Sequence, residues 1–367
     1  MSDRPDRVED GDALAKLRLI RTPGIGPVSY AQIVARFGSA AAAVEALPML
    51  ARRGGGKPPV VASVEVARAE LAAVARLGAT TLFLGDRNYP PLLAELDDAP
   101  AVLAVRGDVG LAARSCVAIV GARNASALAC RFARQIGYEL AEAGATVVSG
   151  LARGIDTAAH VGAMPATVGV IAGGIDIVYP PENAALQEAI ATRGLLVAEQ
   201  PPGTEPRARH FPYRNRIIAG LAQVTVVVEA APKSGSLITA RLAGEMGREV
   251  AAVPGHPLDP RAQGCNGLIR DGATLVQGAA DVMELLRPLD ARMVRAPTTP
   301  FGAPPPADAS DAERARVVGL LGPVPVAVDE LVRQAGTAPA IVQLVLLELE
   351  LAGRLERHAG GRVGLAY

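Results

Sequence analysis

The sequence predicts an α/β protein with a mostly parallel sheet in its main domain, a helical domain before it and a winged helix after it. Three observations support this fold class. β-branched runs alternate with helical patterns from residue 115 to residue 253, a helix–hairpin–helix pattern precedes them, and three short helices with a final hairpin close the chain. The expected boundaries are 1–80 for the helical domain, 81–287 for the α/β domain, 288–310 for a proline-rich linker and 311–367 for the winged helix.

The central alternation of strands and helices defines the predicted sheet. Strands rich in Val and Ile are typical of sheets that are buried on both faces. They are expected at 117–120, 146–149, 167–171, 195–198, 224–229 and 249–253, with helices at 125–143, 155–164, 182–191, 217–221 and 237–246. Because parallel strands end at one edge, the loops after them share a rim, where α/β proteins bind ligands.

The N-terminal region has a helical pattern over 14–50 that is interrupted by the Gly- and Pro-rich segment 22–27, and a further helix is expected at 64–77. Such a hairpin can direct two backbone amides at a phosphate, as in helix-hairpin-helix DNA-binding elements. An ordinary turn between two helices explains the same residues. Both interpretations stay open at this point.

The C-terminal region predicts a winged helix, with helices at 311–321, 328–335 and 339–352 and a hairpin at 354–365. In DNA-binding winged helices the third helix reads the groove. Here residues 340–350 of that helix include two acidic side chains and no basic one. We therefore expect a protein contact or a structural role for this domain instead.

The overall charge is balanced, with 37 basic and 37 acidic side chains. No global field would attract this protein to nucleic acid, so any such affinity requires a concentrated patch. Aromatic residues make up 3% of the chain and Trp is absent, which favours binding through the nucleic-acid backbone over extensive base stacking.

The start of the chain and its cysteines indicate the cellular compartment. Residues 1–12 are polar and contain no apolar signal region, and Gly and Pro interrupt the longer uncharged stretches. Cys116, Cys130 and Cys265 are odd in number and far apart, which argues against a disulfide framework or a Cys-x-x-Cys metal motif. We expect a cytoplasmic protein with buried thiols and no membrane association.

The segment 206–218 is the main candidate for a binding site, because it concentrates basic residues without any acidic one. Guanidinium groups suit phosphate through their permanent charge and planar fork of donors, and interleaved aromatic rings can hold bases. This combination favours single-stranded nucleic acid. A solvated loop whose arginines pair with acids elsewhere is the alternative. The residues concerned are Arg207, Arg209, Phe211, Tyr213, Arg214 and Arg216.

Other rim loops add Gly, Asn and basic residues at the same edge of the predicted sheet. Glycines let the backbone approach a ligand closely, and the start of a helix at 233–236 offers free amides to an anion. We expect Arg123, Arg153, Arg214, Arg216 and Lys233 to face a common cleft. The remaining candidates in these loops are Asn124, Gly150, Gly154, Asn215, Ser234, Gly235 and Ser236.

Five motifs in order resemble the DNA-processing protein A family, also called DprA or Smf. They span most of the α/β domain, and the flanking regions match the family's three-part layout. The motifs are Val120–Ser126, Ser149–His160, Phe211–Gly220, Ser234–Ala240 and Gly264–Ile269.

This resemblance implies an extended Rossmann-like domain that binds single-stranded DNA in a basic pocket, without a cofactor and without catalysis. It also implies a homodimer that protects incoming DNA and loads the RecA recombinase during natural transformation. Carried over by motif, Arg123 and the unit Arg214, Asn215 and Arg216 would contact phosphate. Gly150, Gly154, Ser234, Gly235 and Ser236 would line the pocket.

Two enzyme classes are alternatives. A dinucleotide-dependent oxidoreductase is disfavoured because the loop after residue 120 lacks the second and third glycines of the fingerprint, and Ser149 and Gly150 stand where a ribose-binding acid is expected. A nucleotide hydrolase of the lysine-decarboxylase-like group would require a Gly-Gly-x-Gly-Thr-x-x-Glu motif, whereas Gly173 and Gly174 are followed by Ile and Asp. Glu229 and Asp156 could supply a carboxylate for this chemistry.

Two further chemistries have weaker support in the sequence. Asp156 and His160, four residues apart on one helix, could form half of a metal site, but no third ligand is at hand. Ser234 and Ser236 lack a nucleophile elbow and a base, so helix capping is the better interpretation of both.

Overall fold

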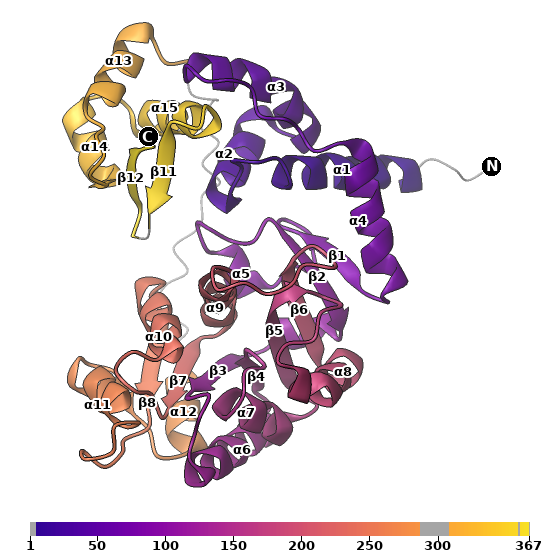
Figure 1. Ribbon diagram of the computed structural model, residues 1–367, viewed down its shortest axis with the longest axis vertical. Helices are drawn as coiled ribbons and strands as arrows, with labels where there is room; N and C mark the ends of the chain where they lie inside the picture. Colours follow the sequence, from indigo (N-terminus) through magenta and orange to yellow (C-terminus); the bar gives the residue numbers. More distant parts are fainter. Residues whose placement is uncertain (1–4, 287–307, 359, 367) are drawn as a thin grey trace, which may run out of the picture. The chain divides into compact units, whose positions relative to one another are not determined.

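The computed structural model describes residues 5–286, 308–358 and 360–366, and the chain divides into two compact units (Figure 1). One unit is Glu70–Val294, which contains the large sheet. The other joins Met1–Ala69 to Arg295–Tyr367 and contains the first helices and the winged helix. The linker predicted at 288–310 lies almost entirely outside the described residues.

Among the described residues, the large sheet has nine strands in the order β1-β2-β6-β5-β4-β3-β7-β8-β9. β2 pairs antiparallel with β1 and β6, and every other neighbouring pair is parallel. The mostly parallel α/β sheet is therefore confirmed. The strands are β1 (Thr80–Phe83), β2 (Val102–Gly107), β3 (Cys116–Gly121), β4 (Thr146–Ser149), β5 (Thr167–Gly174), β6 (Leu195–Gln200), β7 (Val224–Val228), β8 (Glu249–Ala252) and β9 (Thr274–Leu275).

Helices cover both faces of this sheet, as its apolar strands require. Alternate residues of each strand belong to different cores: Ala118 and Val120 pack towards α5, α9, α10 and α11, whereas Val117 and Ile119 pack towards α6, α7 and α12. The helices of this unit are α5 (Pro91–Ala94), α6 (Ala127–Glu142), α7 (Ile155–Ala163), α8 (Ala184–Arg193), α9 (His210–Leu221), α10 (Gly235–Glu245), α11 (Gln263–Arg270) and α12 (Ala279–Leu286).

Helix α9 differs from the sequence prediction, because it begins at His210 and not at residue 217. Pro212 falls in its first turn, where proline is tolerated because the missing amide would have no helical partner. Residues 210–218 of the arginine-rich segment are therefore helical. Residues two apart on a helix point to different sides, so Arg214 and Arg216 cannot face the same cleft.

The other unit contains two small subdomains, and the predicted winged helix is confirmed in it. Three helices and the strands β10-β12-β11 form the winged helix. Its elements are α13 (Asp311–Gly319), β10 (Val326–Ala327), α14 (Val328–Ala335), α15 (Pro339–Leu351), β11 (Leu355–His358) and β12 (Arg362–Leu365). The N-terminal helices are α1 (Pro5–Ile20), α2 (Pro27–Phe37), α3 (Ala40–Arg53) and α4 (Val64–Arg76), which spans the division between the units.

No single helix in the described part of the chain has the length and hydropathy to cross a membrane. The bent pair α2 and α3, which meet at 104°, passes both criteria only when the two are taken together.

Candidate nucleic-acid interface

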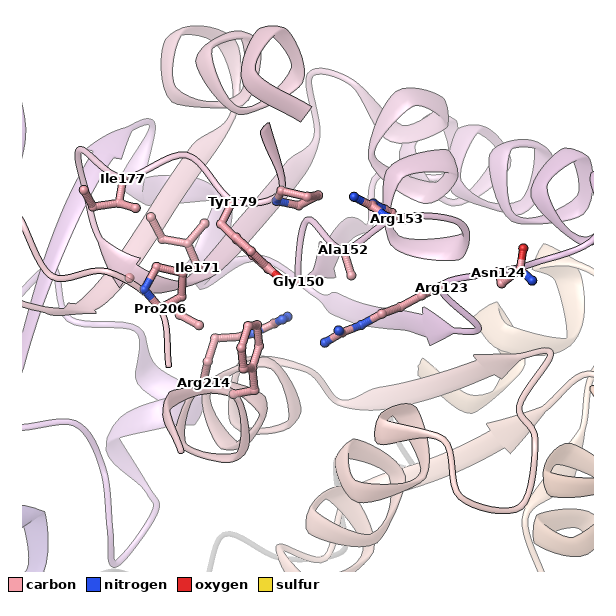
Figure 2. A pocket seen from close by; sticks show the side chains of 14 residues that line it. Arg123, Asn124, Gly150, Ala152, Arg153, Ile171, Ile177, Tyr179, Pro206 and Arg214 are labelled. Atoms are coloured by element: carbon pink, nitrogen blue, oxygen red, sulfur yellow. The ribbon is translucent and has the colours of Figure 1, made fainter. Parts of the chain in front are cut away.

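A pocket of about 330 Å³ lies at the carboxyl ends of β3, β4 and β5 (Figure 2). It is next to the topological switch point between β3 and β7, where the strand order reverses. Ligand pockets commonly start at about 300 Å³, so this one has room for a group the size of a single nucleotide. It is lined by Arg123, Asn124, Gly150, Ala152, Arg153, Ile171, Ala172, Gly173, Ile177, Tyr179, Pro180, Pro206, Phe211 and Arg214.

Arg123 is positioned by the contact between its loop and the start of α7. Gly154 has a φ of 75°, which favours glycine. A Cβ on Gly154 would overlap the carbonyl oxygen of Ala122 and lie 2.7 Å from that of Arg123. The Ile155 amide donates to the Ala122 carbonyl at 3.3 Å. Gly154 therefore lines no ligand surface in the pocket but holds the Arg123 loop in place.

Arg214 is positioned by burial and by the lack of a side chain at Gly150. It comes from the first half of α9 and is only 7% exposed. Its guanidinium occupies the space where a Cβ on Gly150 would be, so Gly150 is required for this placement. Behind it, the Asp156 carboxylate accepts hydrogen bonds from the amides of Gly150 at 3.1 Å and Ala152 at 3.3 Å.

The two arginines converge on one aromatic ring. Figure 2 shows the guanidinium groups of Arg123 and Arg214 pointing toward each other across the pocket. Their Cζ atoms lie 5.3 and 6.0 Å from the centroid of the Phe211 ring, within cation–π range. Two cations on one ring repel each other. An anion between them would therefore be held from both sides.

The electrostatics of Arg214 favour the binding of an anion. Burial lowers the pKa of its guanidinium to about 10; nearby Asp156 opposes this shift and Arg123 adds to it. Burial raises the pKa of Asp156, and Arg214 opposes that shift. The buried Nε of Arg214 has no hydrogen-bond partner among the described residues. A largely buried cation that lines a pocket gains strongly from a phosphate oxygen that enters it.

The far side of the pocket is apolar. Tyr179 and Phe211 form a tilted ring pair with centroids 5.8 Å apart. Ile171, Ile177 and Pro206 complete this wall. A base can pack here while its phosphate lies between the arginines. Single-strand binding sites commonly combine basic residues for the phosphates with aromatic rings for the bases.

Arg153 also lines the pocket, but it forms an ion pair with Glu182. Both side chains are about half exposed or more. Exposed ion pairs are weak, so a phosphate can compete for this arginine.

Arg216 does not line the pocket, contrary to the expected common cleft. Its guanidinium donates to the Glu199 carboxylate at 2.5 Å and to the Asp98 carbonyl at 2.8 Å, and its side chain is 6% exposed. The physical reason is the helical geometry of α9, which turns Arg216 away from Arg214. Arg216 holds the helix against its neighbours.

The remaining candidates lie outside the pocket lining. Arg207 and Arg209 are exposed just before α9, and Lys233 is exposed before α10. Ser234 caps α10 and its hydroxyl lies 2.7 Å from that of Ser236. The Asn215 side chain donates to the Gly235 carbonyl at 3.4 Å, which links α9 to α10.

The sequence did not single out Tyr179 or Ile177, although both line the pocket. β5 extends to Gly174, three residues beyond the predicted strand, so the rim loop after it runs on to Pro180. An exposed tyrosine in a chain with few aromatic residues is the signal that could have identified this loop.

The side chains of Asp156 and His160 both form hydrogen bonds with neighbouring groups of the protein. His160 is fully buried, and its Nδ1 lies 2.7 Å from the Thr167 hydroxyl, which itself donates to the Val147 carbonyl. Nδ1 is therefore the donor and the protonated ring nitrogen. In the described part of the chain, no group of three or more His, Cys, Asp or Glu side chains could hold a metal.

Comparison with known families agrees with this geometry. Residues 80–287 match the model described as DNA recombination-mediator protein A, which is more than half of the chain. The chain belongs to this family, also called DprA. Residues 10–73 match the DprA-like N-terminal helix-hairpin-helix domain, and residues 301–361 match the DprA winged-helix domain.

Relatives of the DprA family resemble the chain over most of its length. Protein Smf of Escherichia coli is 38% identical over 281 residues, which is 76% of this chain and 75% of Smf. DNA processing protein DprA of Bacillus subtilis is 43% identical over 220 residues, 59% of this chain and 74% of the relative.

Two solved DprA structures have the same fold. The Streptococcus pneumoniae protein has a TM-score of 0.60 at 34% identity, and the match covers 73% of this chain and 95% of that one. The Helicobacter pylori protein, which binds single-stranded DNA, has a TM-score of 0.52 at 31% identity, covering 57% of this chain and 95% of that one.

Proposed function

We propose that this protein binds single-stranded DNA, with a phosphate held between Arg123 and Arg214 and a base packed against Phe211 and Tyr179. The observation that carries this proposal is the convergence of the two guanidinium groups on one ring at the edge of a small pocket. The H. pylori relative that binds single-stranded DNA supports the choice of ligand.

The strand continues beyond the pocket in this proposal, because the pocket holds only about one nucleotide. Exposed Arg207, Arg209 and Lys233 would contact neighbouring phosphates through long-range, salt-sensitive attraction. Asn124, Arg153 and Asn215 would add hydrogen bonds near the pocket. Gly154, Ser234, Gly235 and Ser236 would shape the loops and helix starts that these residues need, and Arg216 would act through the stability of α9.

The cellular role that fits this site is recombination mediation. As a member of the DprA family, the protein would act in the cytoplasm as a homodimer, protect incoming single strands during natural transformation and load RecA onto them. This role requires binding without cleavage. It also requires tolerance of any base sequence, which contacts to phosphates and a ring face provide.

Binding titrations test the site directly. We expect Arg123→Ala and Arg214→Ala to weaken binding to oligothymidylate across all sequences, and each to reduce the slope of log affinity against log salt by about 0.7. The matched control is Arg193→Ala, which removes an exposed arginine from the end of α8, before β6, at the opposite edge of the sheet. Equal affinities for all four proteins would refute the assignment.

A separate assay tests the mediator role. RecA added to strands precoated with a single-strand-binding protein should assemble faster in the presence of this protein, and Arg214→Ala should remove that acceleration. If wild-type protein binds single strands tightly but leaves RecA assembly unchanged, the binding site stands and the mediator role fails.

Nucleotide hydrolysis is the enzyme alternative, and Glu229 or Asp156 would supply its carboxylate. Glu229 accepts hydrogen bonds from the amide and the hydroxyl of Ser126 at 2.8 and 2.6 Å, and Asp156 accepts two backbone hydrogen bonds behind Arg214. Both carboxylates therefore hold neighbouring loops in place. We therefore expect no turnover of nucleoside monophosphates or NAD. Turnover that is lost in Asp156→Ala would overturn this conclusion.

A further inference from the structure

Helix α15 of the winged helix has almost no free face. Its apolar residues are buried around the whole circumference, from Ile341 at 7% exposure to Val342 and Leu346 at 0%. Glu348 is 1% exposed and is paired with Arg314 through two hydrogen bonds of 2.8 and 2.9 Å. A helix that is apolar all round is a core helix and does not read a DNA groove.

The end of α3 contacts α15 at backbone distance. A Cβ on Gly54 would overlap the carbonyl oxygen of Glu348 and lie 2.8 Å from the Ala352 Cβ. A Cβ on Gly56 would overlap the backbone of Ala352. The φ of Gly54 is −69°, which any residue adopts. Glycine is therefore needed at position 54 for the close approach and not for the turn.

Polar contacts surround this close approach. The Gln32 side-chain amide donates to the Gln343 oxygen at 2.9 Å, and Arg53 pairs with Asp308 at 2.7 Å. Arg354 donates to the Gly54 carbonyl at 3.0 Å, at the carbonyl end of α3, where a cation is favoured. These contacts combine specific geometry with a close apolar interface, as lasting interfaces do.

The same contact places α15 beside the hairpin between α1 and α2. A Cβ on Gly24 would lie 4.0 Å from the Glu350 carbonyl, near the end of α15. Helix carbonyl ends carry partial negative charge. The carboxylates of Glu348 and Glu350 at this end are paired with Arg314 and Arg357, so they add no net charge. The carbonyl end of α15 therefore lies beside the hairpin, where a phosphate would have to approach its amides.

We propose that the winged helix is a cover for the N-terminal helices of the same chain. Its third helix, α15, packs against α3, and the carbonyl end of α15 covers the hairpin between α1 and α2. Neither α15 nor the hairpin is therefore available to contact DNA. Single-strand binding is left to the pocket in the other unit. The occupant of the α3 surface is the chain's own winged helix, and not a second copy or a nucleic acid.

Cross-linking of the full-length chain tests the contact. Gln32→Cys and Gln343→Cys, in a Cys130→Ser background, place two thiols where the amides now meet. A short bis-maleimide should join them within one chain at low protein concentration, giving a monomer of altered mobility. Cross-linked dimers would assign the surface to a second copy, and the absence of any cross-link would refute the contact.

A steric variant tests the cause. Gly54→Ala with Gly56→Ala should slow the internal cross-link about tenfold or more, because overpacking against backbone costs enough to shift such an equilibrium by this factor. The matched control is Gly319→Ala in α13, where an added Cβ meets no atom within 4 Å. Amide exchange of α15 in chains without added cysteines should rise in the double variant and stay unchanged in the control. Unchanged cross-linking and exchange in the double variant would overturn the proposal.

The locked protein tests the consequence for DNA. Neither α15 nor the hairpin between α1 and α2 takes part in the proposed DNA-binding pocket. The internally cross-linked chain should therefore bind oligothymidylate within about twofold of the untreated chain, a change in binding free energy of less than 0.5 kcal/mol. A tenfold loss on locking would show that the winged helix must open for binding, and would refute the proposal while leaving the pocket intact.

Discussion

Gly150→Ala provides the sharpest test of how the pocket is built. The added Cβ would overlap the guanidinium of Arg214 and lie 2.9 Å from an oxygen of Asp156. Arg214 would have to leave its position, although the variant removes no charge. The effect on DNA binding should therefore resemble the loss of the arginine itself.

The magnitude follows from the contact that would be lost. A hydrogen bond to a charged group contributes about 1.5–3 kcal/mol, which corresponds to a loss of about tenfold to a hundredfold in affinity. Loss of one phosphate contact on a single strand lowers the salt slope by about 0.7. Because Gly150→Ala acts through Arg214, the double variant with Arg214→Ala should bind no more weakly than Arg214→Ala alone.

Fluorescence anisotropy with labelled oligothymidylate at four or more salt concentrations measures both quantities. Gly244→Ala in α10, where an added Cβ meets no atom within 4 Å, is the matched control, and thermal unfolding checks that each variant is folded. Full affinity in Gly150→Ala, or additive losses in the double variant, would refute this account of the pocket.

Three other variants test base stacking, the contribution of an ion pair to stability, and the pH dependence of stability. Phe211→Ala should weaken binding by about 1–3 kcal/mol per base with an unchanged salt slope, because it removes a stacking surface and no charge; a changed slope in the same titrations would contradict this. Arg216→Ala should reduce the free energy of unfolding in denaturant titrations by about 2–4 kcal/mol, because it removes a buried ion pair to Glu199 and a hydrogen bond to the Asp98 carbonyl, while the folded fraction binds DNA normally. Burial lowers the pKa of His160 to about 3, so the unfolded chain takes up a proton below about pH 6.5 that the folded chain does not. Stability should fall by about 1.4 kcal/mol per pH unit from pH 6.5 towards 3, and His160→Gln should remove this part of the slope; an equal slope in both proteins would contradict it.

The convergence of Arg123 and Arg214 was predictable from the sequence because it depends on topology. Both residues lie in or near segments that follow β-strands of a parallel sheet, and such segments meet at one edge whatever the details of each loop. The glycines at 150 and 154 were also recognisable as places of close approach. The sequence did not indicate which group approaches each glycine. The position of the buried Arg214 guanidinium next to Gly150 depends on how α9 packs in three dimensions.

The position of Arg216 was not predictable by the same reasoning, because the sequence pattern predicts a helix only from residue 217. Once α9 is known to begin at His210, the two-residue spacing separates Arg214 from Arg216. The pairing of Arg153 with Glu182 and of Arg216 with Glu199 depends on distant segments. Spacing along the chain carries no information about such partners.

A structure of the protein bound to oligothymidylate tests the central claim most directly. The account predicts one phosphate within hydrogen-bonding distance of both Arg123 and Arg214, with its base against the rings of Phe211 and Tyr179. A strand bound at another surface, with these two arginines still facing an empty pocket, would contradict it.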